Sequence, residues 1–161
     1  MKTTAKSDFL NIVLFEPEIP QNTGNIARLC ACLGAKLYLV GKLGFVLSDK
    51  HLKRAGLDYW DKLDIIHVET LDELIIQNPD SKFYYFTTKT KQIYTEFEYK
   101  MGDFLVFGPE TRGIPESILE KNCSTCATIS MRSHTRSLNL SNSVAIAAYE
   151  AYRQFGSPKL D

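Results

Sequence analysis

Short apolar runs alternate with helical segments along the whole 161-residue chain. The runs are rich in Val, Ile, Leu, Phe and Tyr, and they span residues 9–15, 36–40, 65–68, 83–87, 104–107 and 127–129. Apolar runs of this length, bounded by Gly, Pro, Asn or Asp, predict buried β-strands. Because helices separate the strands and the connections are short, we expect an α/β fold with a mainly parallel sheet and helices on both faces.

Capping signals mark the predicted helices, which span residues 23–33, 70–77, 115–121 and 139–155, with a short basic helix after Ser48. Thr23 is a candidate N-cap, and Gly34 stands where a helix-terminating glycine belongs. Thr70 and Glu73 form a capping box. Pro115 fits the first position of its helix, since that position needs no backbone N–H.

Composition excludes several classes of protein. With 44% hydrophobic and 24% charged residues, the chain is neither a disordered tail nor a collagen-like repeat. Lys plus Arg and Asp plus Glu are equal at 19 each, which argues against a protein that coats nucleic acid non-specifically. The apolar runs are too short for a bilayer and no signal peptide is recognisable, so we expect no membrane association and a cytoplasmic location. One domain over residues 1–161 is expected, with residues 1–8 as a disordered or extended N-terminal extension.

Cysteine and histidine spacing gives little support for a metal site. A zinc site could be formed by Cys30, Cys32, Cys123 and Cys126. However, only one residue separates Cys30 from Cys32, which is unfavourable for tetrahedral coordination. Four free thiols are the better interpretation, and no metal is predicted.

Polar segments follow several strands, at the sheet edge where ligands bind in such folds. Residues 108–113 (GPETRG) directly follow a strand, and Gly108 would allow a ligand to approach the backbone closely. Glu110 and Arg112 offer a carboxylate and a cation there. The segment resembles half of a phosphate loop, but the required Lys-Ser/Thr is absent, which weighs against a nucleotide triphosphatase. A surface turn with solvated charges is the alternative.

Residues 137–142 (SLNLSN) place four hydrogen-bonding side chains at the start of the last helix. Asn139 or Ser141 would suffice as its N-cap, which leaves the others unexplained. The helix start is also a candidate anion site.

Residues 16–25 (EPEIPQNTGN) form a polar loop with two prolines after the first strand. Asn22, Asn25 and Arg28 can point to one face there. The alternative is an elaborate helix cap.

These segments appear in an order that resembles the knotted SPOUT class of RNA methyltransferases, over about residues 10–156. The segments that carry the resemblance are residues 16–30, 54–59, 107–115 and 136–142. Within that class the chain is most similar to the bacterial enzymes that methylate the ribose 2′-oxygen of the tRNA wobble nucleotide.

The resemblance implies S-adenosylmethionine as methyl donor, S-adenosylhomocysteine as product, and no metal. It implies a deep C-terminal trefoil knot and a homodimer whose active site lies at the subunit interface. The implied substrate is the cytidine or modified uridine at position 34 of a tRNA, with tRNA-Leu expected. Another tRNA or rRNA site, a non-catalytic RNA- or cofactor-binding module and an unrelated nucleotide-binding enzyme remain alternatives.

The resemblance also assigns residues by motif. Expected cofactor-binding residues are Phe86, Thr87, Gly108, Glu110, Ile129, Met131, Ser137 and Asn139. Expected catalytic residues are Arg28, Asn139, Ser137, Glu110 and Tyr149. Expected RNA-binding residues are Asn22, Asn25, Arg28, Lys53, Arg54 and Arg136. Arg28 is expected to stabilise the forming alkoxide, since a guanidinium does not deprotonate in proteins.

Overall fold

The computed structural model describes residues 9–47, 50, 54 and 63–161. Its described strands form a six-stranded sheet in the order β3-β2-β1-β5-β4-β6. The strands are β1 (Asn11–Phe15), β2 (Lys36–Val40), β3 (Ile65–Val68), β4 (Phe83–Phe86), β5 (Phe104–Phe107) and β6 (Cys126–Ala127). Every neighbouring pair is parallel, which confirms the predicted sheet.

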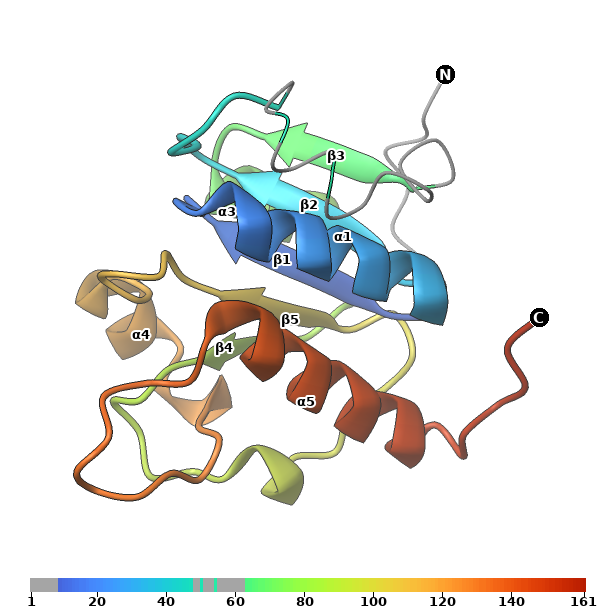
Figure 1. The fold of residues 1–161 in the computed structure, drawn as a ribbon. Helices are drawn as coiled ribbons and strands as arrows, with labels where there is room; N and C mark the ends of the chain where they lie inside the picture. The colour runs from blue at the N-terminus through green and yellow to red at the C-terminus, as the bar shows by residue number, and fades with distance from the viewer. Residues whose placement is uncertain (1–8, 48–49, 51–53, 55–62) are drawn as a thin grey trace.

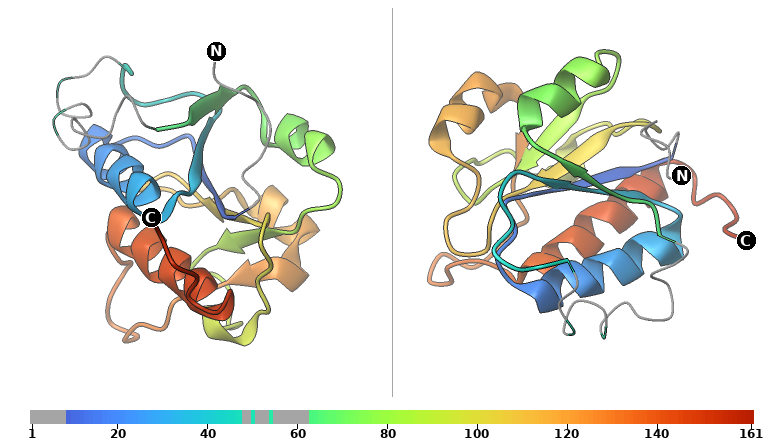
Figure 2. Two further views of the ribbon diagram at one scale, coloured as in Figure 1. Left: turned by 90° about the vertical axis from the view of Figure 1, so that its right-hand side faces the viewer. Right: turned by 90° about the horizontal axis from the view of Figure 1, so that it is seen from above.

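Helices cover both faces of the sheet (Figures 1 and 2). Helices α1 (Pro20–Leu33) and α5 (Leu140–Gln154) pack on one face, where their buried residues share a core with β1 residues such as Ile12 and Leu14. Helices α3 (Leu71–Gln77) and α4 (Glu116–Lys121) pack on the other face, around Val13. The alternation of side chains along β1 therefore supplies both cores, as expected for a central parallel strand.

Two predicted helix starts are wrong. Helix α1 begins at Pro20, with Ile19 as an N-cap that makes no side-chain cap bond, and Thr23 lies buried in the first turn. Pro115 is the N-cap of α4 and not its first helical residue, so this helix begins one residue later than predicted. By contrast, the Thr70 hydroxyl accepts the Glu73 N–H at 3.1 Å, and Gly34 has the left-handed φ of 72° that favours glycine.

The last strand is shorter than predicted because its pairing partner changes. β6 pairs with β4 through Cys126 and Ala127, and this pairing stops at Ala127 because β4 ends at Phe86. Beyond it, the Thr128 N–H donates to the Gln92 carbonyl at 2.8 Å, and the Tyr94 N–H donates to the Thr128 carbonyl at 2.9 Å. The segment after β4, which ends in the short 3-10 helix η2 (Tyr94–Glu96), thus continues the edge.

The strand order reverses beside β1, which pairs with β2 on one side and β5 on the other. Loops that follow such neighbouring strands part in opposite directions and leave a crevice outside the carboxyl ends. The strands point to the left in Figure 1, where the chain between β5 and α4 and the chain leading into α5 lie near each other. The predicted polar segments meet at this edge.

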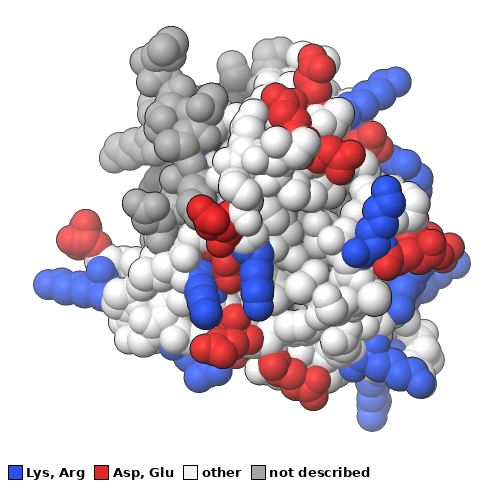
Figure 3. Space-filling view, turned by 180° about the vertical axis from the view of Figure 1, so that it is seen from behind, with Lys and Arg blue, Asp and Glu red and all other residues white. Residues whose placement is uncertain are grey.

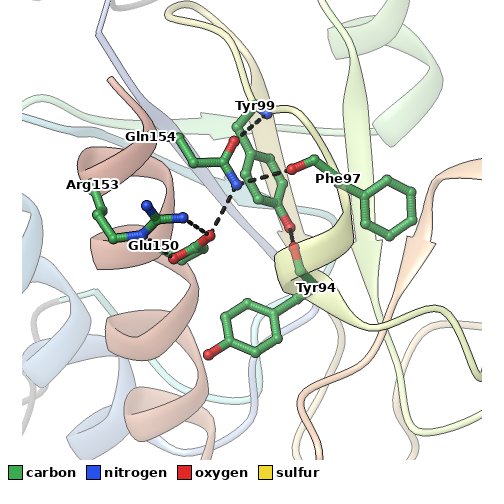
Figure 4. A network of polar contacts seen from close by, with 6 residues as sticks. All are labelled: Tyr94, Phe97, Tyr99, Glu150, Arg153 and Gln154. Atoms are coloured by element: carbon green, nitrogen blue, oxygen red, sulfur yellow. Dashed lines mark hydrogen bonds and ion pairs between the residues drawn. The ribbon is translucent and has the colours of Figure 1, made fainter. Parts of the chain in front are cut away.

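A hydrogen-bond network fixes the far end of α5 (Figure 4). The Gln154 side-chain oxygen accepts the Tyr99 N–H at 2.8 Å, and its amide nitrogen donates to the Phe97 carbonyl at 2.9 Å. The same nitrogen donates to Glu150, which also accepts two bonds from Arg153. Helix α5 is thereby tied to the segment after η2.

Within the part of the chain that the structure describes, no helix is both long and apolar enough to cross a membrane. The predicted extension over residues 1–8 lies outside the described residues, as does most of the basic helix predicted after Ser48.

Candidate active site

A pocket of about 810 Å³ lies outside the carboxyl ends of β4, β5 and β6. Its volume falls in the range of roughly 300–1,000 Å³ that small-molecule sites occupy. Most of the lining comes from residues 86–89, 107–114, 128–131 and 136–140, and Ile19, Asn22 and Ser143 add to it. Segments distant in sequence therefore build one site.

All eight residues expected to bind a cofactor line this pocket: Phe86, Thr87, Gly108, Glu110, Ile129, Met131, Ser137 and Asn139. The structure brings them together at one place, although their role toward a cofactor stays a prediction.

Two stacked phenyl rings form an apolar floor. Phe86 and Phe107 are the last residues of β4 and β5 and are partners in the sheet register. Their ring centroids lie 4.7 Å apart with an angle of 18° between the planes. Both are buried, at 8% and 2% exposure, so they present a fixed apolar surface.

The structure shows a requirement for glycine at position 108 that comes in addition to the predicted approach of a ligand. A Cβ at this position would lie closer than 3.0 Å to the backbone of Gly113 and Ile114. The loop folds back on itself here, and the Gly113 N–H donates to the Pro109 carbonyl at 2.8 Å. Gly113 has a φ of +69°, which reverses the chain.

The Glu110 carboxylate holds the loop that precedes α1. One oxygen accepts the Glu18 N–H at 2.7 Å and the other accepts the Ile19 N–H at 3.2 Å. A carboxylate at the start of a 14-residue helix also interacts favourably with the helix dipole. Glu110 therefore holds the two residues that lead into α1.

Glu18 in turn binds the 108–113 loop through its side chain. Its Oε1 accepts both the N–H and the hydroxyl of Thr111, at 3.0 and 2.7 Å. These bonds lower the pKa of the Glu18 carboxyl below its ordinary value. An ion pair of 3.0 Å between Arg112 and Glu16 lies beside them. We call this group of residues (Glu16, Glu18, Glu110, Thr111 and Arg112) the clasp.

Asn139 is the N-cap of α5, one of the two predicted candidates. Its Oδ1 accepts the N–H groups of Ser141 and Asn142, at 2.9 and 3.3 Å. Its amide nitrogen donates to Asn22 at 3.1 Å and so joins the starts of α5 and α1. Because these N–H groups are occupied, the structure argues against an anion site at this helix start.

The remaining predicted residues are distributed unevenly. Asn22 and Arg136 line the pocket. Asn25 and Arg28 are exposed on α1, and Tyr149 is 46% exposed on α5, so these three do not line the pocket of their own chain. Two further predictions concern Lys53, which lies outside the described residues, and Arg54, which is exposed.

The sequence analysis missed the contribution of Glu18, Thr111 and Lys89. Thr111 and Lys89 line the pocket, and Lys89 pairs with Glu116 at 3.2 Å. Opposite charges in the two strand-end loops, Glu16 and Glu18 facing Arg112, were the available signal for the clasp.

Charge is local rather than extended. Lys89, Arg112 and Arg136 line the pocket. On the face seen in Figure 3, Lys and Arg side chains are interspersed with Asp and Glu. Among the described residues, no three His, Cys, Asp or Glu side chains form a group that could hold a metal ion, and the four cysteines are free thiols.

The fold and the pocket define an α/β protein with a pocket outside the carboxyl ends of its parallel strands, where ligands bind in such folds. Residues 9–149 match the SpoU rRNA methylase family. This chain belongs to that family.

A relative from Escherichia coli, named tRNA (cytidine(34)-2′-O)-methyltransferase, is 46% identical over 151 residues, which are 92% of this chain and 96% of the relative. A solved structure that concerns the 2′-OH methylation of C/U34 on tRNA superposes with a TM-score of 0.88 at 42% identity, covering 93% of this chain and 98% of the other. The SpoU methyltransferase AviRb from Streptomyces viridochromogenes, in complex with AdoMet, shares the fold with a TM-score of 0.81 at 23% identity, covering 96% of this chain and 64% of AviRb.

Proposed function

We propose that this protein is a cytoplasmic enzyme that transfers the methyl group of S-adenosylmethionine to a ribose 2′-hydroxyl of tRNA. The proposed acceptor is the cytidine or modified uridine at position 34, with tRNA-Leu as the expected isoacceptor. Membership of the methylase family and the name of the Escherichia coli relative support this reaction. The observation that carries it is the convergence of the eight motif residues on one strand-end pocket.

The pocket suits the proposed donor in size and in chemistry. S-adenosylmethionine combines a flat heteroaromatic base with a ribose and a charged amino acid. The stacked Phe86 and Phe107 provide an apolar floor, and the side chains of Thr87, Ser137 and Asn139 provide polar groups along the walls. When bound, this cofactor supplies a methyl group that its positive sulfur already activates.

The chain's own residues then mainly position the reactants and stabilise charge. We assign to Arg28 the stabilisation of negative charge that develops on the 2′-oxygen, since its guanidinium stays protonated. Asn22 and Arg136 are assigned to the RNA side of the pocket. Ser137 and Asn139 are assigned to the orientation of the donor, and Glu110 to the position of the wall.

A homodimer is part of the proposal. Arg28 and Tyr149 are exposed and do not line the pocket of their own chain. A second copy that brings α1 and α5 to the pocket would place both beside the reacting groups, and it would cover the exposed side chains of Ile146 and Tyr149. The active site would thus be completed across the interface.

We also propose that the C-terminal part is threaded as a deep trefoil knot. Two facts support this proposal: residues 128–131 and 136–140 line the same pocket as the loops after β4 and β5, and α5 then packs against the face that carries α1.

The proposal is tested with purified protein, labelled S-adenosylmethionine, and total tRNA and rRNA as separate substrates, followed by mass mapping of the methylated nucleotide. We expect one 2′-O-methyl group at position 34 of a tRNA, and none on an anticodon stem-loop with a 2′-deoxyribose at that position. Methylation of rRNA alone would favour the substrate that the family description names. Donor binding without product would favour a non-catalytic module.

A further inference from the structure

Glu18 makes direct contact with a wall of the pocket but does not line the pocket itself. Its carboxylate holds Thr111 through two bonds of 3.0 and 2.7 Å, and its own N–H is held by Glu110 at 2.7 Å. The exchange is reciprocal, because each loop supplies a carboxylate and each supplies backbone N–H groups. If either loop moves away from the other, the bonds of Glu18 to Thr111 and the bond of Glu110 to the Glu18 N–H break together.

The bonds of Glu18 end on residues that do line the pocket. Glu110 and Thr111 are both wall residues, and they lie between Gly108 and Gly113 in the loop after β5. Without an acceptor at Glu18, the N–H and hydroxyl of Thr111 would be solvated and the wall would populate more conformations. A ligand would then have to order the wall on binding, which lowers affinity.

We propose that Glu18 is a positioning residue for the methyl-donor pocket, because it holds the wall over residues 109–112 in the conformation that accepts the donor. This inference rests on the proposed function. It adds a residue that the motif comparison did not place at the site. It also links the donor pocket physically to α1, the helix that carries Arg28.

Three substitutions of Glu18 separate the effects of its side-chain length, its charge and its hydrogen-bond acceptor. Glu18→Ala removes the acceptor, and Glu18→Asp keeps the charge but shortens the side chain by one methylene. Glu18→Gln keeps an acceptor oxygen at nearly the same place. Glu120→Ala, at an exposed glutamate of α4, is the matched control.

We expect Glu18→Ala and Glu18→Asp to raise the Kd for S-adenosylhomocysteine about fivefold or more, the lower end of typical coupling effects. Isothermal titration calorimetry measures this Kd, and steady-state kinetics should show the loss in KM for the donor more than in kcat. Glu18→Gln should restore affinity to within about twofold, which a loss of global stability would not do. Hydrogen exchange of residues 109–113 in the free protein should be faster in the Ala and Asp variants than in the Gln and Glu120→Ala variants.

The outcomes are distinct. Unchanged affinity and unchanged exchange in both Glu18→Ala and Glu18→Asp would overturn the inference while leaving the methyltransferase proposal intact. A Glu18→Gln variant as weak as Glu18→Ala would also overturn it. Failure of the unmodified protein to bind S-adenosylmethionine or S-adenosylhomocysteine would overturn the proposed function and this inference together. If Glu18→Ala does not fold, Glu18→Asp provides the same comparison.

Discussion

The two glycines of the 108–113 loop are required for opposite reasons, and this difference can be measured. Gly108 lacks space, because an added Cβ would lie closer than 3.0 Å to backbone atoms of Gly113 and Ile114. Gly113 has space, with nothing within 4 Å of an added Cβ, but its φ of +69° is unfavourable for other residues. Substituting each with Ala and with Asn therefore separates steric crowding from backbone strain.

The magnitudes follow from these two causes. At Gly108 the clash is with backbone atoms, which cannot rotate away. Gly108→Ala should therefore lower the free energy of unfolding by about 1–3 kcal/mol, as overpacking does. Asn is larger and should cost more. At Gly113 Ala should cost about 1–2 kcal/mol for the left-handed conformation. Asn should cost less there, since Asn adopts that conformation more readily.

Urea unfolding of the four variants gives these costs, and calorimetry with S-adenosylhomocysteine gives the effect on the pocket. We expect Asn to lower the free energy of unfolding more than Ala does at position 108, and less than Ala does at position 113. Donor affinity should fall most in the Gly108 variants. The same order at both positions would refute the reasoning. So would a Gly108→Ala protein that is as stable and binds as tightly as the unmodified one.

Three further predictions concern catalysis, acid stability and capping. Arg28→Ala should slow methyl transfer about a hundredfold at saturating donor, in a filter assay with labelled methyl groups. Hydrogen bonds from Arg153 lower the pKa of Glu150 below its ordinary value of 4.5, so the stability it contributes is present above that pH and is lost as the pH falls through the lowered pKa. The urea midpoint should therefore fall more steeply with acid in the unmodified protein than in Glu150→Gln. Asn139→Ala should cost about 0.5–2 kcal/mol in urea unfolding through loss of the cap, more than Ser143→Ala does.

Much of the fold follows from local pattern. The apolar runs locate all six strands, because buried parallel strands need continuous apolar segments and the flanking turn residues delimit them. The strand-end rule then places the loop after β5 and the approach to α5 at one edge. These two steps identify the pocket without any knowledge of side-chain contacts.

The errors occur where a partner distant in sequence replaces a local signal. Thr23 looks like the N-cap of α1 because threonine often caps helices, whereas the observed helix begins at Pro20 and Glu110 holds the two residues before it. The fold-back of the 108–113 loop adds a second requirement for glycine at position 108, beside the predicted approach of a ligand, and it is likewise not visible in the sequence. Local spacing carries no information about such pairs.

The position of β1 has a consequence for how the protein is made. β1 is the first described strand of the chain, yet one of its edges pairs with β5. Ile12 can therefore pair with Leu105 only after β5 has been synthesised. Until β5 leaves the ribosome, that edge is an open template for wrong pairing. The face that α5 covers stays open longer still, because Val144 and Ala147 complete the core of β1 and α1. The pocket wall at residues 137–140 arrives in the same late stretch. A nascent chain therefore completes this pocket only after residues 137–140 have been made, and we expect chains that stop before α5 to have no complete pocket.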